Sequence, residues 1–353
     1  MFPSFGGKKV KLKEKIVFAN NLSAMIGAGL SLAKSINVME RQTNNKYFKS
    51  VIRDLGARVG KGESLSGSMS AYPKVFPALF ISMVNAGEES GNLPGALKMV
   101  SEQLSKTYDL QRKIKGAMVY PAVIISVISV LGIVMMVYLV PVLTKTFQSM
   151  GVELPMSTQI LIWLSSFMKE HLILVILAIV AAVVSLVAGI KTTRGQRIID
   201  GLIMKIPVIA DISKQSNAAM TMRTISSLIT AGVSMIDTLK ITERILQNHY
   251  FKDIMTEAKE EIQKGTALSV VVKRHEKVYP LLVGEMIEVG EETGDLPGML
   301  LKGASFYEDE VDQTTKNLSS IIEPAIMVII GIAVGFFAVS MLGPMYSLSG
   351  AIK

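Results

Sequence analysis

The chain contains three long apolar stretches, and elsewhere its hydrophobic residues are interspersed with polar ones. They cover Val119–Leu143, Leu172–Ile190 and Pro324–Tyr346, and none contains aspartate, glutamate, lysine, arginine or histidine. Each reaches or exceeds roughly the 20 residues that an α-helix needs to cross a hydrocarbon core about 30 Å thick. We therefore predict three transmembrane helices.

The polar regions between these stretches carry apolar residues at helical spacing. In residues 19–117 one such stripe comprises Phe76, Leu79, Phe80, Met83 and Val84, and a last helix runs without a breaker from about Leu97 to Lys115. Residues 214–320 contain five candidate helices: Met220–Ala231, Met235–Leu246, Tyr250–Lys264, Leu281–Glu292 and Leu296–Leu318. The predicted fold class is an all-α membrane protein with two helical-bundle domains and three transmembrane helices.

The two polar regions repeat each other. Lys74–Gly95 reads KVFPALFISMVNAGEESGNLPG and Lys277–Gly298 reads KVYPLLVGEMIEVGEETGDLPG, which are identical at 12 of 22 positions at an offset of 203. The same offset, without a gap, aligns Ala28-Gly29 with Ala231-Gly232, Tyr47-Phe48 with Tyr250-Phe251, Gly62 with Gly265, Pro121 with Pro324 and Pro141 with Pro344. A duplicated unit, a polar helical domain followed by an apolar span, explains this pattern.

One turn in each copy has a clear helix-ending signal. In Ala28-Gly29-Leu30-Ser31, Gly29 suits a left-handed position after a helix and Ser31 suits the N-cap of the next helix. Gly232 and Ser234 repeat this arrangement in the second copy. We expect two antiparallel helices joined by this turn in each copy.

Basic residues indicate the orientation in the membrane, because cytoplasmic flanks of spans are enriched in lysine and arginine. Such residues cluster before the first span and after the second, whereas residues 144–171 contain only Lys145 and Lys169. We expect a multi-pass protein of the cytoplasmic (inner) membrane with its N-terminus and both domains in the cytoplasm. The predicted segments are a basic arm (1–18), domain 1 (19–117), span 1 (119–143), an external loop (144–171), span 2 (172–190), a basic linker (191–213), domain 2 (214–320), span 3 (324–346) and an external tail (347–353).

Composition removes several kinds of chemistry. The chain has no cysteine and three histidines, so thiol nucleophiles, disulfides and thiolate metal sites are excluded. No GxxxxGK[ST] run is present, which argues against nucleotide hydrolysis by this chain. We expect no enzymatic activity, no cofactor, no metal site and no nucleic-acid partner. The lysines of residues 1–18 are either a solvated tail or a contact with anionic lipid headgroups.

The two copies carry opposite charge. Residues 19–117 hold 13 Lys/Arg and 7 Asp/Glu, a net charge of +6, and residues 214–320 hold 12 Lys/Arg and 16 Asp/Glu, a net charge of −4. Similar domains of opposite charge associate with each other more readily than with themselves. We expect copy one to meet copy two, within or between chains, although ordinary drift of surface charge would give the same numbers.

The most distinctive motif is Gly87–Pro94 (GEESGNLP), repeated as Gly290–Pro297 (GEETGDLP). Its glycine ends one helix, Asn92 or Asp295 caps the next, and proline occupies the first turn. The carboxylates are harder to explain, because acids at a helix C-terminus oppose the macrodipole: Glu88, Glu89, Glu291 and Glu292. Three explanations are open. The carboxylates could reach forward to N–H groups of the following helix, they could face a basic partner, or they could bind a divalent cation weakly.

The absence of charged residues from the three apolar stretches argues against a transport function. Ion-coupled transporters and proton pumps need ionisable or strongly polar groups inside the membrane, and these spans have no charged residue. They contain instead small residues at helix-packing spacing, Gly331 with Gly335 and Ala178 with Ala182. Such spacing also arises by chance in glycine-rich spans. The sequence thus disfavours a permease.

The duplicated AGxS, KGxxLS-like and GEExGxLPG motifs resemble the bacterial type II secretion F domain. The order domain–span–loop–span–domain–span resembles the inner-membrane platform proteins of type IV pili, type II secretion and competence pseudopili. The resemblance covers residues from about 18 to 346. Two departures are a short N-terminal arm and Asn20-Asn21, where such first copies usually carry an arginine–glutamine pair; Arg223 occupies the equivalent of Asn20 in copy two.

The resemblance implies a non-enzymatic platform that couples a hexameric cytoplasmic assembly ATPase to the insertion of pilin or pseudopilin subunits into a fibre. It further implies other inner-membrane assembly proteins as partners, self-association, and contact with the lipid bilayer. On this view the acidic motif residues, together with Asn92 and Asp295, are candidate partner-binding residues. The alternatives are a membrane scaffold for another assembly and, with less support, a transport permease.

Overall fold

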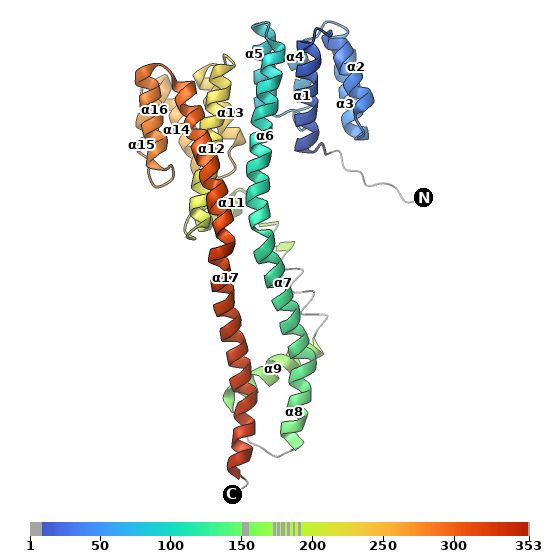
Figure 1. Ribbon diagram of the computed structural model, residues 1–353, viewed down its shortest axis with the longest axis vertical. Coiled ribbons are helices and arrows are strands. Elements are labelled where there is room, and N and C mark those ends of the chain that lie inside the picture. Colours follow the sequence, from blue (N-terminus) through green and yellow to red (C-terminus); the bar gives the residue numbers. More distant parts are fainter. Residues whose placement is uncertain are drawn as a thin grey trace. The chain divides into compact units, whose positions relative to one another are not determined.

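The computed structural model describes residues 9–149, 155–171 and 192–351, with seven separate positions between 172 and 191. Every regular element in these ranges is a helix (Figure 1). The chain divides into two compact units: the first combines Met1–Lys113 with Asp200–Gln313, and the second combines Ile114–Ile199 with Thr314–Lys353. Most of both polar regions therefore belongs to one unit.

The first copy of the repeat supplies six helices. They are α1 (Leu12–Gly27), α2 (Leu32–Gln42), α3 (Lys46–Val59), α4 (Leu65–Ser70), α5 (Ala78–Glu89) and α6 (Leu93–Ala117). After α11 (Thr193–Ile203), the second copy supplies α12 (Ile209–Thr230), α13 (Met235–Ile245), α14 (His249–Gln263), α15 (Leu268–Lys273), α16 (Leu281–Thr293) and α17 (Leu296–Ala351). Helices α2 to α6 each begin 203 residues before α13 to α17, so the sequence offset is also an offset of helix starts.

The predicted turn chemistry is confirmed. Gly29 and Gly232 have φ angles of 88° and 89°, in the left-handed region that side chains with a Cβ disfavour. Ser31 and Ser234 are the N-caps of α2 and α13. The Ser234 hydroxyl accepts a hydrogen bond from the Asp237 amide at 3.2 Å. The left-handed glycine ends one helix and lets the chain reverse into the next.

Three helix expectations need correction. The helix predicted over Met220–Ala231 begins well before Met220, as α12 at Ile209. The short helix α15 was not predicted, because its six residues are too few to show a periodicity. The last helix was expected to end near Leu318, yet α17 continues as one helix through Pro324 to Ala351 (Figure 1). Proline removes a single N–H from the ladder, and no glycine or capping turn accompanies Pro324 to end the helix.

The core of the first copy is built around aromatic rings. Phe18 lies 5.6 Å from Phe48 and 5.9 Å from Phe76 between ring centroids, and Phe76 lies 5.2 Å from Phe80. The same core includes Leu228 and Ile241 of the second copy. The two copies therefore share buried apolar surface within the first unit.

The second copy replaces part of this aromatic cluster by a buried polar pair. At the 203-residue offset, Thr221 takes the place of Phe18 and Tyr279 that of Phe76. The hydroxyl oxygens of Thr221 and Tyr279 lie 2.9 Å apart in a hydrogen bond, and both residues are buried. Burial raises the pKa of Tyr279 above its ordinary value, partly offset by the hydrogen bond with Thr221.

We expect the Tyr279→Phe variant to be less stable than the intact protein by about 1 kcal/mol near neutral pH, because the buried Thr221 hydroxyl loses its partner. The folded protein holds the phenolic proton more tightly than the unfolded chain does. The contribution of the Tyr279 hydroxyl to the free energy of unfolding is therefore constant below the tyrosine pKa of the unfolded chain, about 10, and falls as the pH rises above that value. Urea unfolding of both proteins from pH 8 to pH 11 checks this. A deficit in Tyr279→Phe that stays constant over this range would contradict the assignment.

The second unit contains α7 (Val119–Val134), the π-helical segment η1 (Met135–Leu139), α8 (Val140–Ser149), α9 (Met156–Glu170) and the C-terminal part of α17. Val140, Leu161 and Met341 form a small buried apolar cluster there. Among the residues that the structure describes, two helices are long and apolar enough to cross a membrane, Leu93–Thr146 and Leu296–Leu342. The third predicted span, 172–190, lies mostly outside the described residues. The predicted loop 144–171 contains the end of α8 and the whole of α9.

Candidate functional site

The first glutamate of each duplicated acidic motif caps a short helix. The Glu88 carboxylate accepts hydrogen bonds from the backbone N–H groups of Leu65 and Ser66, at 2.5 and 3.0 Å, and from the Ser66 hydroxyl at 2.5 Å. These N–H groups begin α4 and have no partner within the helix. The negative charge also complements the positive end of the α4 dipole.

Glu291 repeats this arrangement in the second copy. Its carboxylate accepts from the N–H groups of Leu268 and Ser269, at 2.8 and 3.3 Å, and from the Ser269 hydroxyl at 2.5 Å. The helix capped is α15. Leu-Ser recurs at the same offset in both copies, so comparing the two duplicated motifs with each other could have identified the partner.

Of the three explanations, a reach forward to the following helix is wrong for the first glutamate of each motif. The carboxylates of Glu88 and Glu291 reach back 22 and 23 residues to α4 and α15 rather than forward to the following helix. The following helices have their own caps, since Asn92 Oδ1 accepts from the Gly95 amide at 3.1 Å and Asp295 Oδ1 accepts from the Gly298 amide at 3.0 Å. The predicted capping role of Asn92 and Asp295 is confirmed.

The glycines of the motif are required by close packing and by backbone conformation. Gly91 and Gly294 have φ angles of 69° and 75°. A Cβ at Gly87 would lie 2.3 Å from the Ala96 Cβ, and one at Gly290 would lie 2.8 Å from the Leu296 Cα. Helix α5 thus approaches the start of α6, and α16 the start of α17, too closely for a side chain.

The second glutamate of each motif is exposed. Glu89 accepts a hydrogen bond from the Asn85 side-chain amide at 2.7 Å, and Glu292 is exposed on α16. No group of three or more Asp, Glu or His side chains in the described ranges is placed to hold a metal ion. Of the four motif glutamates, Glu89 and Glu292 are therefore the two that are open to another molecule.

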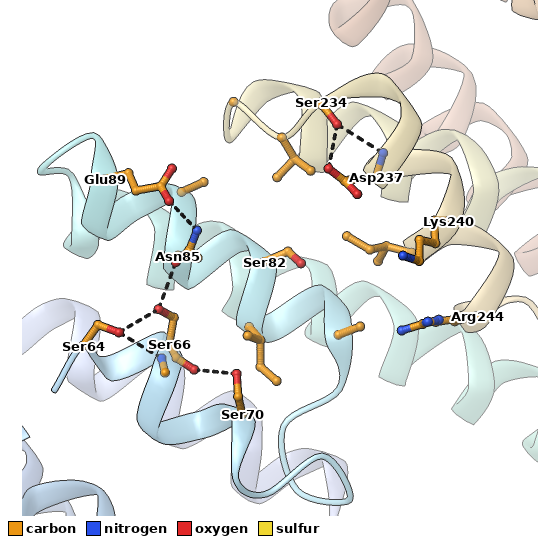
Figure 2. Close-up of a pocket in the computed structure, with 17 residues that line it drawn as sticks. Ser64, Ser66, Ser70, Ser82, Asn85, Glu89, Ser234, Asp237, Lys240 and Arg244 are labelled. Carbon is orange, nitrogen blue, oxygen red and sulfur yellow. Dashed lines mark hydrogen bonds between the residues drawn. The ribbon is translucent and has the colours of Figure 1, made fainter. Parts of the chain in front are cut away.

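Figure 2 shows a polar groove in the first unit next to Glu89. The groove has a volume of about 550 Å³, and α4 and α5 form one wall while α13 and the turn before it form the other. Asn85 and Glu89 lie on the α5 side, and Asp237, Lys240 and Arg244 lie on the α13 side. Both signs of charge line it, so it suits a polar, zwitterionic contact more than a small apolar ligand.

The two copies also meet through α6, α12 and α17. The Gln103 side chain donates to the Thr224 hydroxyl at 3.1 Å and accepts from the Ser227 hydroxyl at 3.2 Å. Arg223 forms a two-pronged ion pair with Glu308, and Lys106 Nζ lies 3.4 Å from the same carboxylate. Lys113 of copy one pairs with Asp312 of copy two at 3.0 Å.

These contacts confirm that copy one meets copy two, and they do so within one chain. In the two ion pairs that join the copies, the lysines come from α6 and the carboxylates from α17, as the opposite net charges predict. The Arg223–Glu308 pair lies within copy two. Gln103 was not predicted, although the departure at Arg223, where copy one has Asn20, marked the region as different between the copies.

The structure describes only two of the four candidate membrane-packing residues. Gly331 and Gly335 lie in α17, and a Cβ at either would meet no atom within 4 Å. Ala178 and Ala182 lie outside the described residues. In the second unit, Thr158 of α9 donates to the carbonyl of Ser340, and Ser165 donates to that of Met136 at 2.5 Å. These hydrogen bonds tie α9 to α17 and to η1.

Comparisons with known proteins agree with this architecture. The family model "Type II secretion system (T2SS), protein F" matches the chain twice, at residues 18–141 and 221–344. The chain is similar to "Type IV pilus assembly protein PilC" of Thermus thermophilus, with 32% identity over 97% of this chain and 84% of the relative. It is similar to the protein of the same name from Pseudomonas aeruginosa, with 33% identity over 98% of this chain and 92% of the relative. It also resembles "Type II secretion system protein F" of Aeromonas hydrophila, with 27% identity over 96% of this chain and 87% of the relative. The chain belongs to the type II secretion system protein F family.

Proposed function

We propose that this chain is an inner-membrane platform protein of a type IV pilus or a type II secretion or competence pseudopilus. The observation that carries the proposal is similarity along nearly the whole chain to proteins named for pilus assembly, at 32% and 33% identity. The identity to a secretion protein F is lower, at 27%, which favours a pilus over a secretion pseudopilus.

On this proposal the first unit faces the cytoplasm and receives a hexameric assembly ATPase. The exposed Glu89 and Glu292, on equivalent positions of the two copies, are the proposed contact residues. The charge-free apolar helices present a lipid-facing surface to the apolar helix of a pilin, and Gly331 and Gly335 leave room for close approach of another helix. Movement of the ATPase then lifts each pilin toward the fibre, with other inner-membrane assembly proteins around the platform.

A deletion experiment tests the proposal. Cells that lack this chain should lose surface pili while pilin accumulates in the membrane, and the intact gene should restore them. Loss of protein secretion with normal pili would assign the chain to a secretion pseudopilus instead. Normal pili and normal secretion in the deletion strain would refute both forms of the proposal.

The acidic motif can be tested in the same cells. The Glu89→Lys/Glu292→Lys variant should be present at normal level and fail to restore pili, because it changes exposed side chains without removing a cap. Lys46→Glu/Glu260→Lys alters exposed positions elsewhere on the first unit and serves as the matched control. Normal piliation in the Glu89→Lys/Glu292→Lys strain would remove these residues from the proposed contact.

We further propose that α9 lies in the outer part of the bilayer. Its polar residues Thr158 and Ser165 face inward, whereas large apolar side chains are exposed on the other side: Met156, Ile160, Trp163, Leu164 and Phe167. A helix at a water-exposed surface has the opposite arrangement. Tryptophan is also enriched at membrane interfaces.

The single tryptophan makes this testable. Trp163 is the only tryptophan of the chain and is 68% exposed. In liposomes, its fluorescence should be quenched by brominated lipid and little affected by aqueous iodide, and Trp163→Phe should remove the signal. Strong iodide quenching without quenching by brominated lipid would place α9 in water and contradict the proposal.

A further inference from the structure

Within the first unit, one surface of each copy is covered by the other copy. Helix α5 of copy one packs against α12 and α13 of copy two. Val233 and Ile245 of copy two pack against the first-copy core, and Val233 also lines the groove in Figure 2. We call the first-copy surface the α4–α5 face and the second-copy surface the α12–α13 edge.

Because the copies align at an offset of 203, each of these surfaces has a counterpart. The counterpart of the α4–α5 face is the α15–α16 face of copy two, and that of the α12–α13 edge is the α1–α2 edge of copy one. These two counterparts lie at opposite ends of the first unit (Figure 1). They therefore do not cover each other within a chain.

The uncovered α15–α16 face carries a group of exposed apolar side chains. It exposes Val270, Leu281, Leu282 and Val289, with exposed fractions between 38% and 58%. On the α1–α2 edge, Leu30 and Val38 are half-buried, at the positions that correspond to Val233 and Ile241. Both surfaces thus retain the apolar character of an interface without having a partner among the residues that the structure describes.

The charges of the two surfaces have changed in complementary directions. Ser82 and Asn85 of the α4–α5 face correspond to Glu285 and Glu288, so the α15–α16 face has gained carboxylates. Lys273 pairs with both, at 2.9 and 2.6 Å, and its pKa is raised by these hydrogen bonds. Two carboxylates therefore surround one lysine, which leaves the α15–α16 face with a net negative charge.

The edge that would meet this face is basic. Asp237 of the α12–α13 edge corresponds to Lys34 on the α1–α2 edge, and Arg244 corresponds to Arg41. Both Lys34 and Arg41 are exposed. Complementary charge around an apolar centre is the arrangement that favours specific association.

A second pair of surfaces is consistent with the same packing. Gln103 of α6, which contacts α12 within the chain, corresponds to Phe306 of α17, and Met220 of α12 corresponds to Val17 of α1. Phe306 and Val17 are each 45% exposed. If the packing of copy one on copy two is repeated between chains, it covers these side chains together with the α15–α16 face.

We propose that a second copy of this chain packs its α1–α2 edge on the α15–α16 face, repeating between chains the contact that joins the copies within a chain. Such a contact uses a different surface on each partner, so it builds either a closed ring or an open string of chains. The proposal does not depend on the proposed function.

Cysteine cross-linking tests the contact directly, since the full chain has no native cysteine. Asp237 and Asn85 line one groove, and their counterparts are Lys34 and Glu288. Lys34→Cys/Glu288→Cys in native membranes should give dimers and higher species with a short bis-maleimide. Lys46→Cys/Glu260→Cys, exposed on α3 and α14, should remain monomeric. Absence of dimers in the first variant, or equal yields in both, would overturn the proposal.

A charge exchange separates a direct contact from a structural effect. In the purified full chain, Lys34→Glu should weaken self-association about fivefold at low salt, and adding Glu288→Lys should restore it. Lys46→Glu is the matched control and should leave it unchanged. Unaltered self-association in Lys34→Glu, or failure of Glu288→Lys to restore a loss, would contradict the inferred pairing. Both readouts are independent of pilus formation.

Discussion

Replacing Glu291 with alanine should lower the free energy of unfolding of the first unit by about 1–3 kcal/mol. The variant leaves the N–H groups of Leu268 and Ser269 and the Ser269 hydroxyl without their acceptor, and a partly buried donor that loses its partner costs about that much. It also removes a negative charge from the positive end of the α15 dipole. Pulse proteolysis of the full chain in native membranes across a urea series measures the change.

Its neighbour in the motif is the matched control. Glu292→Ala removes an exposed carboxylate and should change stability by no more than about 0.5 kcal/mol. Glu88→Ala and Glu89→Ala repeat the comparison in copy one, where Glu88 makes the same three hydrogen bonds. Equal losses from both members of a pair would show that the first glutamate does not act as a cap.

The second large effect is expected at the motif glycine. Gly87→Ala would place a Cβ 2.3 Å from the Ala96 Cβ and 3.2 Å from the Asn92 carbonyl oxygen. Helices α5 and α6 would have to move apart, and overpacking of this kind costs about 1–3 kcal/mol. The same pulse-proteolysis measurement should show the loss. Gly116→Ala, where an added Cβ meets nothing within 4 Å, should be neutral or slightly stabilising.

A compensating change identifies the contact. In the Gly87→Ala/Ala96→Gly variant the single Cβ of this contact moves from α6 to α5. The double variant should be more stable than the sum of the two single losses predicts, as expected for residues that touch. Strict additivity would mean that Gly87→Ala acts through something other than its approach to Ala96.

The hydrophobic pattern predicted much of the first unit because its helices are long, amphipathic and separated by glycine turns. The starts of α13, α16 and α17 follow from that pattern, and Gly29 and Gly232 occupy the predicted left-handed positions. The continuation of α17 through Pro324 was not predictable from local signals. Neighbouring turns on both sides carry the helix across a single missing hydrogen bond.

The acidic motif shows where local reasoning ends. Glu88 and Glu291 lie at a helix C-terminus, where a carboxylate opposes the helix dipole. This unfavourable position indicated that each carboxylate has a partner elsewhere. Their partners lie more than 20 residues away, on α4 and α15, and only the folded unit brings them together. Likewise, opposite charge predicted that the copies meet, but the contacts of Gln103, Lys106 and Lys113 depend on how α6 lies against α12 and α17.

The central claim, that this chain is the platform of a pilus or pseudopilus machine, is tested most directly by affinity purification of the full chain from native membranes. Quantitative mass spectrometry should find an assembly ATPase and pilin-like proteins enriched with the intact chain. The ATPase should be reduced with the Glu89→Lys/Glu292→Lys variant, and pilin retained. If neither is enriched above an unrelated multi-pass membrane protein, and transport or other scaffold components are found instead, the platform account is wrong.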